Sequence, residues 1–177
     1  MGFFETYLDN LTKVILDAPA HELALVAERL RRCSEVGGKV ILVGNGGSAA
    51  IASHVAVDLT KTAGVRAVNF NESSLVTCFA NDYGYEHWVK EALHSFADDC
   101  DVLILISSSG ESLNILNGAL YASARGISVI TLSGFALENS LSTLGDINLW
   151  VDSSEYNTVE NTHQIWLLAI SDYLVSC

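Results

Sequence analysis

Two short segments rich in glycine and serine carry the residues best suited to hold an anion. Residues 44–48 read Gly-Asn-Gly-Gly-Ser, and residues 107–112 read Ser-Ser-Ser-Gly-Glu-Ser. Glycine lets backbone N–H groups approach an anion closely, and hydroxyl and amide groups can hydrogen-bond a phosphate or a sugar. A tight turn capped by Ser48 would explain the first segment alone, but one cap does not explain four serines in the second. The two segments together favour binding of a phosphorylated sugar.

Histidines and carboxylates at helical spacing supply candidate proton-transfer groups. His54 and Asp58 are four residues apart, and Glu160 and His163 are three apart, so each pair can share one helix face. A reaction that moves a proton between two carbons of a sugar through an enediol needs such a base and a partner acid. The same four side chains could bind Zn²⁺ or another divalent metal, and the residue types leave open whether one is bound.

Five short apolar segments indicate the strands that would position these groups. Continuous apolar runs of this kind suit parallel strands covered by helices on both faces. The expected strands span 39–43, 66–70, 102–106, 128–132 and 147–151, and the expected helices span about 48–61, 84–97, 112–125 and 157–175. This alternation predicts an α/β fold, an open doubly wound, mainly parallel five-stranded sheet flanked by helices. Both glycine/serine segments follow a strand, which is where such sheets bind ligands.

Composition limits the class of protein further. The chain has 177 residues, half of them hydrophobic, which suits one domain with a sizeable core. A net charge of −12 with only nine Lys and Arg residues argues against nucleic-acid binding. Four scattered cysteines show no metal-binding spacing, and the chain shows neither a signal-peptide pattern nor an apolar run of about 18 residues. We therefore expect a cytoplasmic protein with no membrane contact and no nucleotide cofactor.

The order of four motifs resembles the sugar isomerase (SIS) fold and, within it, the phosphoheptose isomerase family. The motifs are GNGGSAA at 44–50, ANDYGYE at 80–86, ISSSGES at 106–112 and LSG at 132–134. The resemblance implies one flavodoxin-like domain over residues 1–177, with an N-terminal helical segment over 1–36 and an α/β core over 37–177. It also implies a homotetramer with the N-terminal helices between subunits and active sites near the interfaces. The substrate contacts that it implies are Asn45, Gly46, Gly47, Ser48, Asn81, Asp82, Ser107, Ser108, Ser109 and Ser112.

The resemblance also implies an activity, the conversion of sedoheptulose 7-phosphate to a heptose 7-phosphate for a lipopolysaccharide or capsule. His54 and Asp58 stand where the family has a metal-binding histidine and a glutamate that also serves as base. Family members carry a glutamine on the C-terminal helix and a histidine eight residues after it. If Glu160 replaces that glutamine, Leu168 stands in place of the acid. If His163 is that histidine, Glu155 takes the glutamine position.

We favour a third arrangement, in which Asp58, Glu160 and His163 are the catalytic groups and His54, Asp58, Glu160 and His163 form the metal site. Glu111 is a further departure, since the family commonly has an uncharged residue there. A carboxylate beside a phosphate is unfavourable unless it points away or contacts a hydroxyl. These departures keep two alternatives open, a non-catalytic regulatory protein that binds phosphosugars and an isomerase of another ketose phosphate.

Overall fold

Five parallel strands form the centre of the computed structural model, which describes residues 2–176. The strands are β1 (Val40–Gly44), β2 (Ala67–Asn69), β3 (Val102–Ile106), β4 (Ser128–Ser133) and β5 (Ile147–Trp150). Their order in the sheet is β2-β1-β3-β4-β5, and every neighbouring pair is parallel. The predicted open, doubly wound sheet is confirmed, and the strands lie within one residue of the expected ranges at every end.

Two layers of helices cover the sheet because successive strand residues point to opposite faces. Val40 and Leu42 of β1 pack with α2 (Ala20–Glu35), α3 (Gly47–Lys61) and α7 (Tyr156–Ser176). Ile41 and Val43 pack on the other face with α5 (Trp88–Phe96) and α6 (Leu113–Ala124). Because helices cover both faces of the sheet, a central strand such as β1 is apolar at every position.

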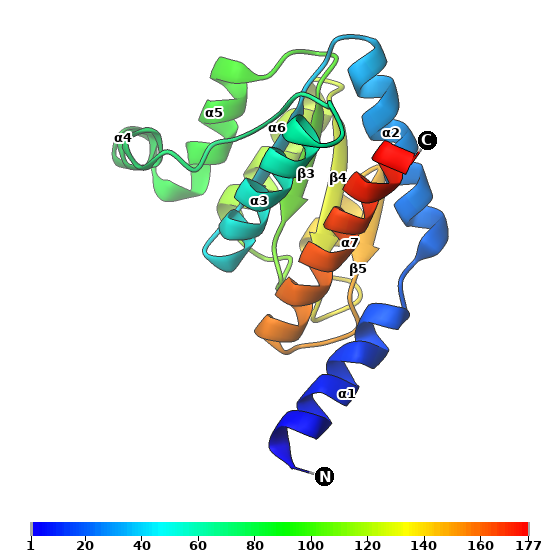
Figure 1. The fold of residues 1–177 in the computed structure, drawn as a ribbon. Helices are drawn as coiled ribbons and strands as arrows, with labels where there is room; N and C mark the ends of the chain where they lie inside the picture. The colour runs from blue at the N-terminus through cyan, green and yellow to red at the C-terminus, as the bar shows by residue number, and fades with distance from the viewer. Residues whose placement is uncertain (1, 177) are drawn as a thin grey trace.

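Two helices lie outside these layers. The first helix, α1 (Phe3–Leu16), buries none of its residues and projects away from the sheet (Figure 1). The helix α4 (Ser73–Tyr83) was not predicted, and it also has no fully buried residue between 73 and 83. It touches the core only through partly buried Leu75, Val76 and Phe79. Short 3₁₀ turns, η1 (Tyr85–His87) and η2 (Ser140–Thr143), complete the described elements. No helix within residues 2–176 has the length and apolar character needed to cross a membrane.

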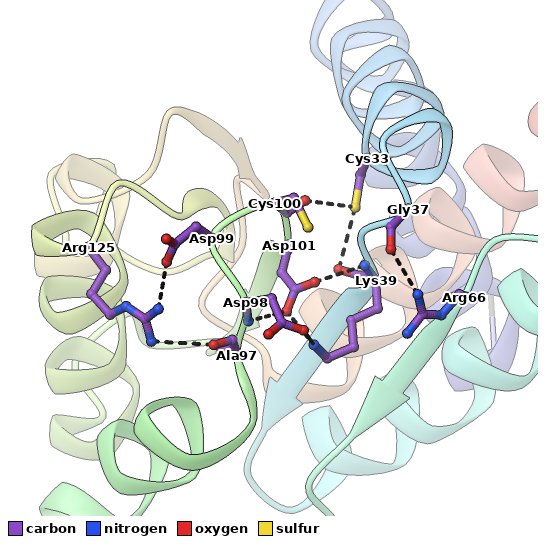
Figure 2. A network of polar contacts seen from close by, with 10 residues as sticks. All are labelled: Cys33, Gly37, Lys39, Arg66, Ala97, Asp98, Asp99, Cys100, Asp101 and Arg125. Carbon is purple, nitrogen blue, oxygen red and sulfur yellow. Dashed lines mark hydrogen bonds and ion pairs between the residues drawn. The ribbon is translucent and has the colours of Figure 1, made fainter.

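An ion-pair network fixes the starts of β1 and β3 (Figure 2). It lies at the amino-terminal ends of these strands, whereas the glycine/serine loops follow their carboxyl ends. Asp101, almost fully buried, accepts from the Lys39 backbone N–H at 2.9 Å, from Lys39 Nζ at 2.6 Å and from the Asp98 N–H at 2.8 Å. Burial lowers the pKa of Lys39, but its hydrogen bonds to Asp101 and Asp98 outweigh burial and raise that pKa overall. The network holds the two strands whose far ends carry the candidate site.

Candidate functional site

The first glycine/serine loop joins the end of β1 to the start of α3. Gly46 has a φ of 54°, a left-handed conformation that side chains other than glycine rarely adopt. A Cβ on Gly44 would lie 2.6 Å from the backbone of Ser48, so the loop turns back tightly over the strand end. The N–H groups of the first turn of α3 face this loop, and the helix dipole makes the loop favourable for an anion.

The second loop joins β3 to α6 and presents the serine hydroxyls. Ser107 and Ser108 are buried, and Ser107 Oγ donates to Ser112 Oγ at 3.3 Å. Ser109 Oγ accepts the Glu111 N–H at 3.2 Å. Ser108 Oγ has no hydrogen-bond partner within residues 2–176. A buried hydroxyl without a partner is unfavourable, so this loop has unused hydrogen-bonding capacity next to a helix N-terminus.

The two loops lie side by side because β1 and β3 are neighbours in the sheet, with Gly44 paired to Ile106. A direct bond also connects them: the side-chain amides of Asn45 and Asn114 exchange two hydrogen bonds, at 3.0 and 2.9 Å. Tyr85 Oη donates to Asn45 Oδ1 at 3.0 Å. Asn45 was predicted as a site residue, whereas Asn114 and Tyr85 were not. Tyr85 lies within the ANDYGYE motif, and Asn114 lies two residues after Ser112, so both had a signal in the sequence.

Glu111 of the second loop is hydrogen-bonded to Ser140. Its carboxylate accepts the Ser140 N–H at 2.8 Å and the Ser140 hydroxyl at 2.7 Å. These bonds, first the backbone one and then the hydroxyl one, lower the pKa of Glu111. Gly110 beside it has a φ of 70°, and a Cβ there would overlap the Asn139 side-chain amide. The loop is therefore held against the start of η2.

Glu160 on α7 lies against the first glycine/serine loop. A Cβ added to Gly47 would overlap the Glu160 carboxylate, so the two residues are in close contact. Gly47 begins α3, where the partial positive charge of the helix end favours a carboxylate. The structure thus brings Glu160 together with the loop over 44–48, although the two are more than 100 residues apart in the chain.

His54 and Asp58 share one face of α3 as expected from their spacing. His54 Nε2 lies 4.0 Å from Asp58 Oδ2, and both side chains are partly exposed. Gln164 of α7 donates from Nε2 to His54 Nδ1 at 3.1 Å. This donation requires an unprotonated Nδ1 and leaves the Nε2 hydrogen on the side of Asp58. Gln164 was not predicted, although it is a glutamine on the C-terminal helix, the residue type that the family carries there.

His163 is fully buried, with 0% of its surface exposed. Its Nε2 donates to the Ser133 carbonyl at the end of β4, over 3.0 Å. Its Nδ1 has no partner within residues 2–176. Burial lowers the pKa of His163 to about 4, despite the opposing effect of the bond to Ser133. The ring is therefore neutral at neutral pH, and its described hydrogen bond is to the end of β4.

The four residues expected to hold a metal do not form one group: His54 and Asp58 are neighbours on α3, but Glu160 and His163 do not complete a set of ligands with them. Residues 2–176 contain no group of three or more His, Cys, Asp and Glu side chains that could hold a metal ion. The physical reason is that His163 is buried against Ser133, while His54 faces Gln164.

Two of the predicted substrate contacts, Asn81 and Asp82, lie exposed on α4. Asn81 Nδ2 donates to Asp82 Oδ1 at 2.9 Å, and no described contact joins the two residues to either loop.

Comparison with known proteins agrees with this architecture. Residues 3–134 match the family model described as SIS domain. The phosphoheptose isomerase of Helicobacter hepaticus is 33% identical over 179 residues, which cover 98% of this chain and 90% of that protein. The structure of phosphoheptose isomerase from Neisseria gonorrhoeae superposes with a TM-score of 0.89 at 27% identity, over 97% of both chains. A phosphoheptose isomerase structure from Francisella tularensis shares the fold over the full length of both chains, with a TM-score of 0.91 at 24% identity. This chain therefore belongs to the SIS domain family and, within it, to the phosphoheptose isomerases.

Proposed function

We propose that this protein is a sugar-phosphate isomerase that converts sedoheptulose 7-phosphate to a heptose 7-phosphate. The observation that carries the proposal is the joined pair of loops at the ends of β1 and β3, with the Glu160 carboxylate against the first loop. The loop after β3 can hold a phosphate, and the loop after β1 can hold sugar hydroxyls. The Glu160 carboxylate lies beside the loop after β1.

Neutral donors would hold the phosphate. Ser107, Ser108, Ser109 and Ser112 precede α6, a helix of 12 residues, so their hydroxyls and the first N–H groups of the helix can converge on one anion. Such a site needs no lysine or arginine, which fits a chain with a net charge of −12. Asn45 to Ser48 would then contact the sugar, and Asn81 and Asp82 would do so only if a second subunit brought them to the site.

Proton transfer is assigned to the carboxylates. Glu160 is the group placed to take a proton from C1 of a sugar bound over Gly47, while the C2 carbonyl oxygen gains a proton to give an enediol. Protonation of C2 and loss of the proton from the C1 hydroxyl then complete the isomerisation. Asp58, with the His54 N–H beside it, supplies the second acid–base pair. His163 enters the proposal through its bond to the Ser133 carbonyl, which fixes the end of β4.

A divalent metal is not given a step in this mechanism, because the expected ligands are not gathered within residues 2–176. Zn²⁺ dependence is tested by removing metal with a chelator and then adding Zn²⁺ back. We expect isomerase activity to survive the chelator within about twofold. Loss of activity that Zn²⁺ restores would contradict this assignment of the proton transfer to side chains alone.

The proposal includes a homotetramer in the cytoplasm. Charged sugar phosphates do not cross membranes unaided, so an enzyme that acts on them works where they are made. The exposed apolar face of α1, with Phe3 and Phe4 about three-quarters exposed, supports burial of this helix between subunits. The product would feed synthesis of a surface polysaccharide such as lipopolysaccharide or a capsule.

A second candidate is a non-catalytic protein that binds phosphosugars in a regulatory role. The burial of His163 and the absence of an assembled metal group in the described chain favour it, because both remove groups expected of the catalytic half. The two loops would be retained in either case. Turnover is therefore what separates the two candidates.

The deciding experiment measures binding and turnover on the same protein samples. We expect wild-type protein to isomerise sedoheptulose 7-phosphate and Glu160→Gln to lose at least about 100-fold in kcat, as for removal of a general base, while it still binds the sugar phosphate. Glu35→Gln, at an exposed carboxylate at the end of α2, is the matched control and should keep full activity. Binding without turnover by the wild type, across a panel of ketose phosphates, would support the regulatory candidate instead.

A further inference from the structure

We infer that Asn114 and Tyr85 are positioning residues that fix the Asn45 amide as a hydrogen-bond donor to the sugar. The inference rests on the proposed function only in that the loop over 44–48 binds the sugar part of a sugar phosphate. It concerns binding, so it is testable whether or not the protein turns the sugar over.

The first step is the saturation of the Asn45 oxygen. An amide oxygen accepts two hydrogen bonds, and Asn45 Oδ1 already accepts from Asn114 Nδ2 at 2.9 Å and from Tyr85 Oη at 3.0 Å. The Asn45 Nδ2 group has two hydrogens, and one of them is donated to Asn114 Oδ1 at 3.0 Å. Among the contacts described for residues 2–176, one Nδ2 hydrogen is the hydrogen-bonding capacity that the Asn45 side chain has left.

The second step is the rigidity of this arrangement. Asn114 is 2% exposed, and it lies in the first turn of α6, so packing holds its side chain. Asn45 is half-buried and can still reach a ligand. A reciprocal amide pair fixes the plane of both amides, and rotating Asn45 alone would bring two N–H groups face to face. The free Nδ2 hydrogen is therefore held in one direction.

The third step concerns which loops are connected. Asn45 belongs to the loop proposed to hold the sugar, and Asn114 directly follows the serine loop proposed to hold the phosphate. The pair therefore sets the distance between the Asn45 donor and the phosphate site. Tyr85 belongs to η1, the short turn between α4 and α5, so its bond to Asn45 connects a third segment to the two loops. A donor pre-set in this way loses little conformational entropy when the sugar binds.

The test is the affinity for sedoheptulose 7-phosphate and, separately, for inorganic phosphate, both measured by calorimetry. Tyr85→Phe removes one donor to Asn45 and leaves the ring in place. We expect it to weaken binding of the sugar phosphate about three- to tenfold, the effect of one neutral hydrogen bond, and to leave phosphate binding within about twofold. Tyr83→Phe is the matched control, because Tyr83 and Tyr85 are 53% and 52% exposed, and it should change neither affinity.

A double-mutant cycle shows whether Tyr85 acts through Asn45. In an Asn45→Ala background, Tyr85→Phe should have no further effect on sugar-phosphate affinity. Asn114→Leu should behave like Tyr85→Phe but more strongly, and circular dichroism checks that this buried variant folds. Because Tyr85 is exposed, its variant decides the question even if Asn114→Leu does not fold.

Three results would overturn the inference: an equal loss of phosphate affinity in Tyr85→Phe, a full effect of Tyr85→Phe in the Asn45→Ala background, or no effect of Tyr85→Phe at all. Binding of the sugar phosphate without turnover would refute the proposed isomerase but leave this inference standing. No binding by the wild-type protein would refute both.

Discussion

At the scale of single residues, hydrogen-bond partners decide what a side chain can do in the site. Glu111 looks unfavourable in the sequence because it stands in a loop proposed to bind phosphate. In the structure its carboxylate is occupied by the N–H and the hydroxyl of Ser140. Asn45 shows the opposite case, since its partners leave one N–H free. The type of a residue is visible in the sequence, whereas its free hydrogen-bonding capacity is not.

Glu111→Asn should leave sugar preference unchanged. The carboxylate is hydrogen-bonded to Ser140, so we expect the relative activities toward a panel of ketose phosphates to stay within about twofold of wild type. The shorter side chain should instead loosen the start of η2, which a lower melting temperature would report. A changed order of preference among the sugars would show that Glu111 contacts the substrate.

At the scale of elements, the strands and their loops could be predicted and one helix could not. β1 and β3 are continuous apolar runs that lead directly into glycine or serine, and this pattern indicates a buried parallel strand followed by a binding loop. Residues 73–83 form α4 with only Leu75, Val76 and Phe79 against the core, too few apolar positions to predict a helix. Two contacts of the site could not be predicted from the sequence, because they join segments that are far apart in the chain. Gln164 meets His54, and His163 meets Ser133, only through the packing of α7.

The contact between α7 and β4 should make stability depend on pH. The unfolded chain protonates His163 with the ordinary pKa of 6.5, whereas burial lowers the pKa in the folded protein to about 4. The unfolded state therefore binds more protons between these values, and the free energy of unfolding falls as the pH is lowered from 6.5 to about 4. The difference corresponds to about 3 kcal/mol.

His163→Gln tests this dependence, because glutamine can still donate to the Ser133 carbonyl but does not titrate. Urea denaturation at pH 7.5 and at pH 4.5 gives the free energy of unfolding at each pH. We expect the drop between the two pH values to be smaller in His163→Gln than in wild type, by about 2 to 3 kcal/mol. Equal drops in both proteins would mean that His163 is protonated in the folded state.

At the scale of the whole molecule, α1 extends from the α/β core (Figure 1). Several of its apolar side chains are exposed. An exposed apolar helix of this kind favours association with another copy. Phe4→Asp should therefore lower the molar mass measured by light scattering, by splitting the proposed tetramer into smaller species. Leu120→Asp is the control, since Leu120 is an exposed apolar residue on α6, and it should leave the mass unchanged. A wild-type protein that is monomeric at micromolar concentration would contradict the proposed assembly.

The central claim is that this molecule isomerises a ketose phosphate through proton transfer at Glu160. It is tested most directly by following sedoheptulose 7-phosphate in D₂O by proton NMR. The account predicts formation of a heptose 7-phosphate with deuterium at C2, because the enediol is reprotonated from a group that exchanges with solvent, and no product with Glu160→Gln. A wild-type protein that forms no product and incorporates no deuterium, or a Glu160→Gln variant as active as wild type, would contradict it.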